Sequence, residues 1–195
     1  AKTTGQITRD HSIKEDRVGD VPVYSLVGGK WTSFRAFSEQ MADRAMNQIN
    51  RTRKGSTAAL PIRGGKDLPL SDAEKIKYGK ALAEKYVLTE EYAKELVIRY
   101  GTWAEKIASF IKANKGKALK SIPNWNSGEL VHILQTEKPV HLDDIFIRRS
   151  TIAWLGNASE KVIEEFADIM ADEYKWSAAK KKEEIEHVRS ILANA

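Results

Sequence analysis

The sequence predicts a mainly α-helical protein, in which a domain of about six to seven helices follows a short segment of two strands and a helix. Apolar residues recur at helical spacing in nearly every segment after Ser71. Helix start signals precede several of these segments, the clearest being the capping box Ser71-Asp-Ala-Glu74. Residues 1–30 instead carry strand-like patterns. We therefore expect a helical C-terminal domain with a strand-containing N-terminal segment.

Residues 1–30 are expected to be extended. Residues 6–13 alternate roughly between polar and apolar side chains, and residues 21–27 form a nearly continuous apolar run between turn signals. Such a run is typical of a strand that is buried on both faces. Because two strands alone do not make a stable sheet, this segment is expected to pair with strands from elsewhere or to have been separated from them.

A helix is expected from Thr32 onward, with Thr32 or Ser33 as its N-cap. Its apolar face consists of Phe34, Phe37, Met41, Ala45 and Ile49. We assign residues 1–55 to the tail of a first domain and residues 56–70, with their prolines and glycines, to a linker.

Residues 71–195 are predicted to form an all-helical domain that is large enough to fold alone. Its first helix runs from the capping box to about Val87, and the second begins after Thr89 and stops at Gly101. The remaining helices are expected near residues 103–116, 127–136, 142–155, 162–174 and 178–192.

Composition excludes several classes of protein. The chain has 42% hydrophobic and 30% charged residues, which is too apolar for a disordered chain. It has no cysteine, so disulfides, thiolate metal sites and cysteine nucleophiles are ruled out. The net charge of +5 is confined to the N-terminal third: residues 1–66 hold 12 Lys and Arg against 6 Asp and Glu, and residues 67–195 hold 20 against 21. This distribution favours a small anionic ligand over nucleic acid.

The stretch Tyr24-Ser-Leu-Val-Gly-Gly-Lys-Trp-Thr-Ser-Phe-Arg35 is the strongest candidate site. A strand, a glycine turn and a helix N-terminus together favour anion binding, because glycine permits close backbone approach and the first amides of a helix lack partners. Lys30 adds a positive charge there, and Arg35 is a candidate neighbour. The alternative is an ordinary turn with a solvated lysine, since Gly-Gly-Lys lacks the spacing of known phosphate-binding loops.

Other titratable residues predict no second site. The acidic pairs Asp143-Asp144 and Glu164-Glu165 are interpreted as solvated helix surface. The four histidines lack metal-ligand spacing, so no metal is expected. The run Lys180-Lys-Lys-Glu-Glu184 is interpreted as a surface salt-bridge network, with a basic membrane-facing patch as the alternative.

Four segments resemble one family, the FAD-dependent glycerol-3-phosphate dehydrogenases and related oxidases. Val27-Gly-Gly-Lys-Trp-Thr-Ser-Phe-Arg35 is similar to the family signature V-G-G-K-(W/L)-T-T-(Y/F)-R, with Ser33 where the family often has threonine. The other matching segments are Ile7-Thr-Arg-Asp-His11, the Asp144–Ala153 segment, and the tail Phe166–Trp176 with Lys182–Glu186. The resemblance covers nearly the whole chain, in the family's order.

The resemblance implies that the chain is the C-terminal part of a flavoenzyme that oxidises sn-glycerol 3-phosphate to dihydroxyacetone phosphate by hydride transfer to FAD. It implies that residues 1–55 are the end of an FAD-binding α/β domain and that the rest of that domain lies in a missing N-terminal portion. Lys30 would be catalytic, Arg9 would bind substrate, and the cofactor-binding residues would be Gly28, Gly29, Lys30, Trp31 and Thr32. A quinone or oxygen would accept the electrons.

The isolated chain is expected to be inactive and not to retain FAD. The expected location is cytoplasmic, with peripheral contact at the inner face of the cytoplasmic membrane left open. A homodimer formed through the strand at residues 21–27 also stays open. The competing hypothesis is a free-standing helical interaction module whose Gly-Gly-Lys corner binds an anion and whose first 50 residues add a strand to a partner's sheet.

Overall fold

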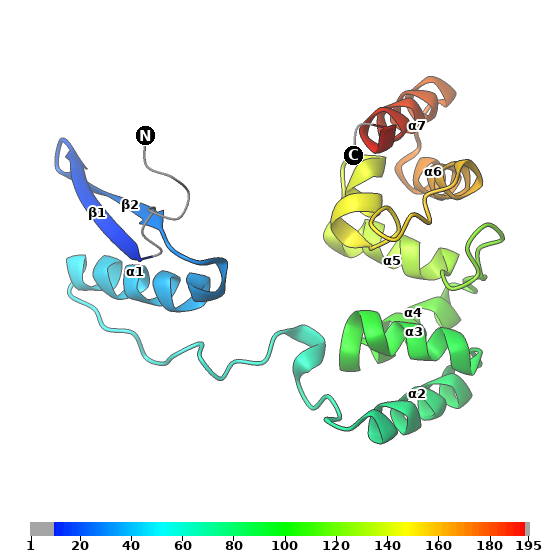
Figure 1. Cartoon of the computed structure of the whole chain (residues 1–195), viewed down its shortest axis with the longest axis horizontal. Coiled ribbons are helices and arrows are strands. Elements are labelled where there is room, and N and C mark those ends of the chain that lie inside the picture. The colour runs from blue at the N-terminus through cyan, green and yellow to red at the C-terminus, as the bar shows by residue number, and fades with distance from the viewer. Residues whose placement is uncertain (1–9, 194–195) are drawn as a thin grey trace. The chain divides into compact units, whose positions relative to one another are not determined.

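A computed structural model of the chain describes residues 10–193, which form two compact units divided between Pro61 and Ile62 (Figure 1). The described part of the chain is mainly helical, as the sequence predicts, and its two strands lie near the N-terminus. None of its helices is both long enough and apolar enough to cross a membrane.

The first unit contains an antiparallel hairpin and one long helix. Strand β1 (His11–Val18) pairs with β2 (Val21–Gly28), and the register places Val18 opposite Val21. The short helix η2 (Trp31–Ser33) leads into α1 (Phe34–Gln48). Among the described residues of this unit, one hydrophobic side chain is buried, that of Phe37 on α1.

The hairpin agrees with one expectation from the sequence and corrects another. Residues 11–13 of the segment expected to be extended begin β1, and the turn at Gly19, where φ is +60°, sets the register of the pair; residues 6–9 lie outside the described residues. The second strand is not buried on both faces: Val21, Val23, Leu26 and Val27 are between 38% and 63% exposed. Within the described chain, β1 and β2 pair only with each other.

The second unit is a succession of helices in which each packs against the next. After η3 (Arg63–Gly65) come α2 (Asp72–Tyr86), α3 (Glu90–Tyr100), η4 (Gly101–Trp103), α4 (Ala104–Ala113), α5 (Ser127–Glu137), η5 (Asp144–Arg149), α6 (Glu160–Tyr174) and α7 (Ala178–Ala193). One apolar cluster is built from α2, α3 and α4, and a second from α5, η5, α6, α7 and the segment before α5.

Local signals in the sequence explain where several helices begin and end. Ser71 accepts from the amide of Glu74, whose carboxylate accepts from Ser71 in return, which confirms the capping box. Thr89 accepts from the amide of Tyr92 at 3.2 Å. Gly101 ends α3 with φ +58°, as expected for a glycine after a helix.

The helix expected at residues 142–155 is shorter in the structure. The π-helix η5 ends at Arg149, and Ser150 is extended. The Ser150 hydroxyl donates to the carbonyl of Ile145 at 2.7 Å and accepts from the amide of Ile152 at 3.3 Å. The Ser150 side chain thus bonds to backbone groups that would otherwise pair within a helix, and the helix ends at this point.

Two of the acidic residues interpreted as solvated surface are structural. Asp143 is 4% exposed and accepts from Arg148 at 2.6 Å. Glu165 is half-buried and accepts from the amide and hydroxyl of Ser121. Their partners are distant in sequence or on the next turn, so adjacency in the sequence did not reveal them.

A buried polar cluster joins α3 to α5. Glu129 is fully buried and accepts from the hydroxyls of Tyr92 at 2.6 Å and Tyr100 at 2.7 Å. The Arg99 Nε atom lies 3.0 Å from its carboxylate, and the guanidinium lies 4.6 Å from the centre of the Trp125 ring. Burial raises the pKa of the Glu129 carboxyl, and the charge of Arg99 together with the hydrogen bonds from the two tyrosines opposes this effect.

Candidate functional site

The turn between β2 and α1 brings together the residues predicted to bind a cofactor, Gly28, Gly29, Lys30, Trp31 and Thr32. Gly28 and Gly29 have φ of +76° and +97°, a region that side chains disfavour. A Cβ on Gly28 would lie 2.9 Å from the Asp10 carbonyl oxygen, and one on Gly29 would lie 3.1 Å from the His11 Cβ. Both positions therefore favour glycine for conformation and for space.

Ser33 closes the turn from the helix side. Its amide and its hydroxyl both donate to the carbonyl oxygen of Lys30, at 3.0 and 2.8 Å. The hydroxyl is therefore engaged in the turn and does not cap α1, although Ser33 occupies the N-cap position; Thr32 lies one residue earlier, in η2. The dipole of α1 places a partial positive charge at this end of the helix, so the turn combines this charge with the ammonium of Lys30.

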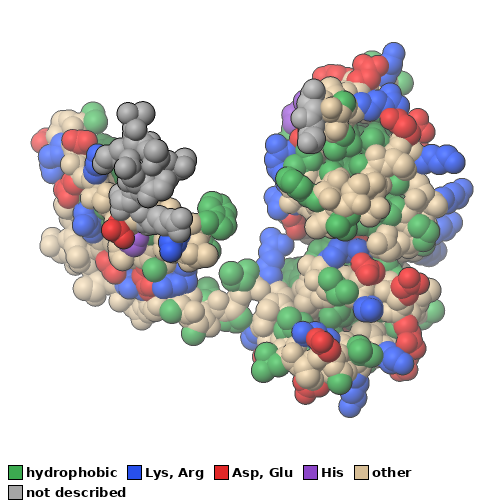
Figure 2. All heavy atoms as spheres, in the orientation of Figure 1, with side chains coloured by type: hydrophobic (Ala, Val, Ile, Leu, Met, Phe, Trp, Pro, Cys, Tyr) green, Lys and Arg blue, Asp and Glu red, His purple; other side chains and the backbone are tan. Residues whose placement is uncertain are grey.

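Two aromatic side chains beside the turn are exposed. Trp31 is 90% exposed and Phe34 is 59% exposed, and their ring centres lie 6.4 Å apart. Figure 2 shows hydrophobic side chains reaching the surface of this unit. Exposed aromatic rings of this size mark a surface that another group can cover. The turn can thus receive a ligand or a protein segment that is both flat and negatively charged.

His11 fixes the start of β1 against α1 next to the turn. Its ring centre lies 4.3 Å from that of Phe37, and its Nε2 donates to the side-chain oxygen of Gln40 at 3.0 Å. Sequence reasoning gave His11 no role of its own, although it lies in one of the quoted motifs. The contact with Phe37 holds the hairpin and the helix in one arrangement around the glycines.

Arg35, a candidate neighbour of Lys30, is engaged elsewhere. Its guanidinium binds Glu39 and also donates to Thr57 at 3.2 Å. Hydrogen bonds from Ser56 and Arg35 lower the pKa of Glu39 to about 2, so this carboxylate is ionised at neutral pH. Within residues 10–193, no ion pair engages Lys30. Lys30 is therefore the cation that the turn can offer to a ligand, while Arg9 lies outside the described residues.

Comparison with known proteins identifies one family. Residues 55–181 match the family model described as the C-terminal domain of alpha-glycerophosphate oxidase. The chain is 27% identical to a mitochondrial glycerol-3-phosphate dehydrogenase of Arabidopsis thaliana, over 98% of this chain and 32% of the relative. It is 29% identical to a probable mitochondrial glycerol-3-phosphate dehydrogenase of Dictyostelium discoideum, over 98% of this chain and 29% of the relative.

A bacterial relative gives the same result. The aerobic glycerol-3-phosphate dehydrogenase of Bacillus subtilis is 27% identical over 100% of this chain and 36% of its own length. The chain thus spans about a third of the length of the curated relatives that it matches. The glycine turn precedes the matched domain, because it lies before residue 55.

Proposed function

This chain belongs to the family of C-terminal domains of alpha-glycerophosphate oxidase, and we propose that it completes a flavoenzyme that oxidises sn-glycerol 3-phosphate to dihydroxyacetone phosphate. The observation that carries the proposal is the exposed glycine turn, which presents Lys30 at the start of a helix. In this proposal, the rest of the FAD domain belongs to a longer natural protein of which these 195 residues are a part.

The residues of the turn fit a flavin ring. Gly28 and Gly29 are exposed, and Trp31 and Phe34 offer exposed aromatic surface beside them. The proposed contacts with the cofactor come from Gly28, Gly29, Lys30, Trp31 and Thr32. When bound, FAD supplies the acceptor for the hydride that leaves the substrate.

Lys30 and the N-terminal end of the helix dipole act electrostatically in this proposal. Their positive charge would stabilise the negative charge that the acceptor gains with the hydride, and it is already in place before the reaction begins. A fixed charge of this kind lowers the barrier because it need not reorganise during the reaction. Arg9 is proposed to bind the dianionic phosphate and so to hold the substrate in register with the site.

The proposal is tested on the whole natural protein by measuring dihydroxyacetone phosphate formation from glycerol 3-phosphate. We expect Lys30→Ala to lower turnover at least ~100-fold, the scale for loss of one preorganised charge. The matched control is Lys14→Ala, which removes an exposed lysine from β1 in the same unit. Turnover close to that of the unaltered enzyme in the Lys30 variant would remove Lys30 from the mechanism.

The isolated 195-residue chain is proposed to be inactive and to bind FAD weakly, because one exposed turn cannot enclose a flavin. A purified chain that is yellow, or that oxidises glycerol 3-phosphate by itself, would contradict this part of the proposal. A whole protein without flavin would contradict the proposal as a whole.

A further inference from the structure

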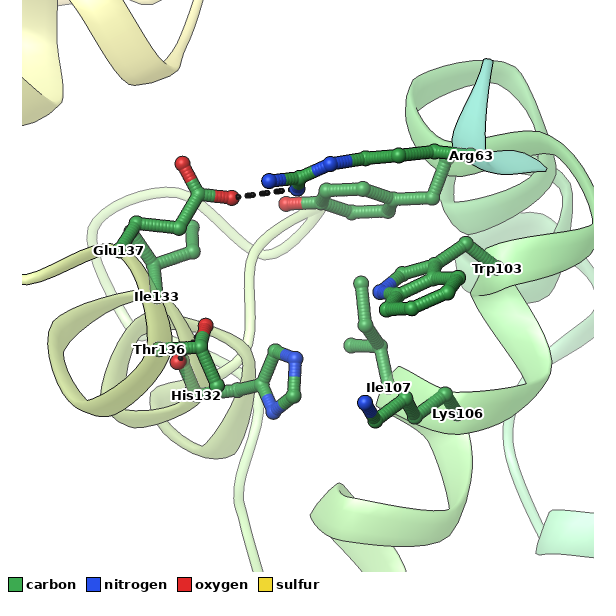
Figure 3. Close-up of a pocket in the computed structure, with 9 residues that line it drawn as sticks. Arg63, Trp103, Lys106, Ile107, His132, Ile133, Thr136 and Glu137 are labelled. Carbon is green, nitrogen blue, oxygen red and sulfur yellow. Dashed lines mark hydrogen bonds and ion pairs between the residues drawn. The ribbon is translucent and has the colours of Figure 1, made fainter. Parts of the chain in front are cut away.

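The helical unit contains a cavity far along the chain from the glycine turn. It lies between α4 and α5, has a volume of about 150 Å³, and is shown in Figure 3. Its apolar wall includes Trp103, Ile107 and Ile133, and its polar lining includes Arg63, Lys106 and His132. The cavity is therefore small, with an apolar body and a group of basic side chains.

His132 is the polar group that needs a partner. It is 6% exposed, and its Nδ1 atom has no hydrogen-bond partner within the described chain. Its ring is held in position by Phe110, whose ring centre lies 5.0 Å away in an edge-to-face arrangement. Figure 3 shows the imidazole pointing from α5 into the space toward α4. An unpaired buried nitrogen is costly, so a ligand that bonds to it gains the free energy of that missing partner.

The charges around the cavity favour an anion. Glu137 is the acidic residue of the lining, and it is already paired with Arg63 at 3.1 Å and Arg149 at 2.9 Å. The Lys106 ammonium lies 4.5 Å from the centre of the Trp103 ring, and no ion pair engages it among residues 10–193. Lys106 is therefore a positive charge next to an aromatic wall, with no carboxylate to balance it.

We propose that this cavity binds a small organic monoanion, namely a carboxylate attached to a flat apolar body of about the size of benzene. A cavity of roughly 150 Å³ has room for a molecule of the size of benzene. The carboxylate would bond to Lys106 and His132, and the apolar body would lie against Trp103, Ile107 and Ile133. This site is independent of the oxidation reaction proposed above.

The pKa of His132 predicts how binding of such a ligand depends on pH. Burial, followed by the positive charge of Lys106, lowers the pKa of the imidazole, while Glu137 opposes this effect. The other charged group lining the cavity is Arg63, which is paired with Glu137. A bound carboxylate would offset the charge of Lys106 and raise the pKa of His132. We therefore expect affinity to increase as the pH falls from about 7.5 to about 5.

The experiment titrates benzoate into the 195-residue chain and follows the imidazole resonances of His132 by NMR. Benzyl alcohol serves as the neutral counterpart, and inorganic phosphate serves as the anion without an apolar body. Lys106→Met removes the charge, and Lys112→Met is its matched control because Lys112 lies on the same helix and also covers an aromatic ring, that of Tyr86.

We expect saturable binding of benzoate that perturbs His132, and at least about tenfold weaker binding by benzyl alcohol and by phosphate. Lys106→Met should weaken benzoate binding at least about tenfold, and Lys112→Met should change it less than about twofold. Since Lys106 is exposed, its variant is expected to fold normally. No saturable change at His132, or equal binding of benzoate and benzyl alcohol, would overturn the proposal.

Discussion

Glu184 shows how a single buried carboxylate connects two elements of the helical unit. It lies on α7, is 2% exposed, and accepts from Lys180 Nζ at 2.8 Å, His141 Nδ1 at 2.9 Å and the Leu142 amide at 2.9 Å. Burial alone would raise the pKa of this carboxyl, but the hydrogen bonds from these partners outweigh burial and lower the pKa to about 2. Glu184 therefore joins α7 to the segment before η5 through its ionised form.

The lowered pKa of Glu184 predicts that the stability of the folded protein decreases in acid. The pKa of Glu184 is lower in the folded protein than its ordinary value of 4.5, so its contribution to stability is present above pH 4.5 and is lost as the pH falls toward 2. The hydrogen bond with Glu184 raises the pKa of His141 above 6.5, so the contribution of His141 is fully present below pH 6.5 and is lost as the pH rises through the raised value.

Glu184→Gln should lower the free energy of unfolding by about 1–3 kcal/mol at pH values between these limits, because it removes hydrogen bonds to a charged group. The variant should also lose part of the acid dependence below pH 4.5. Urea unfolding across the pH range measures both effects. Glu183→Gln is the control, because Glu183 is the adjacent residue and its side chain is 69% exposed. Equal losses in the two variants would contradict the role assigned to Glu184.

At the scale of elements, η3 and η4 meet through their backbones. A Cβ on Gly64 would lie 1.7 Å from the backbone oxygen of Tyr100, and one on Gly101 would lie 2.2 Å from the Gly64 oxygen. The Thr102 hydroxyl is 3.2 Å from the Gly64 carbonyl oxygen and 2.7 Å from that of Lys66. The segment that precedes α2 is thus held against the end of α3.

Gly64→Ala should destabilise the protein by about 1–3 kcal/mol or more, because the added methyl group forces the two backbones apart. Gly65→Ala is the matched control: a Cβ there meets nothing within 4 Å, and its φ is not positive. That change should be neutral or stabilising by up to about 1 kcal/mol. Thermal unfolding of both variants tests the contact, and similar melting temperatures would show that η3 is not held in this way.

The sequence predicted elements best where the controlling residue lies inside the element. Ser71 with Glu74, Thr89 and Gly101 act within a few residues, so the boundaries they set are confirmed. The end of η5 depends on a serine side chain that bonds to carbonyl and amide groups on both sides, and helical periodicity carries no sign of it. The contact of Gly64 with Tyr100 could not be predicted from the sequence pattern either, because backbone atoms make it.

The two candidate sites differ in the same respect. The glycine turn could be found from the sequence because its residues are consecutive and each type has a local function. The cavity at His132 could not, since Arg63, Lys106 and His132 come from three separate elements. A buried histidine on an apolar face carries no sign of whether its nitrogen has a partner until the neighbouring helix is in place.

At the scale of the whole molecule, buried apolar residues are distributed unequally between the two units. Phe37 is the buried hydrophobic of the first unit among the described residues, whereas the second unit contains both apolar clusters. The hairpin also exposes Val21 and Leu26, at 63% and 47%. A two-stranded hairpin with so little burial is at best marginally stable. The first unit is therefore expected to be the less stable of the two.

Hydrogen exchange of the 195-residue chain should reveal this difference. Amides of α5 and α6, which contain the fully buried Leu130, Leu134 and Phe166, should exchange at least about 100-fold more slowly than those of β1 and β2. If the strands belong to an FAD domain as proposed, they should gain protection in the whole natural protein. Strands that are as well protected as α6 in the isolated chain would contradict this, and light scattering would then distinguish a stable hairpin from one covered in a dimer.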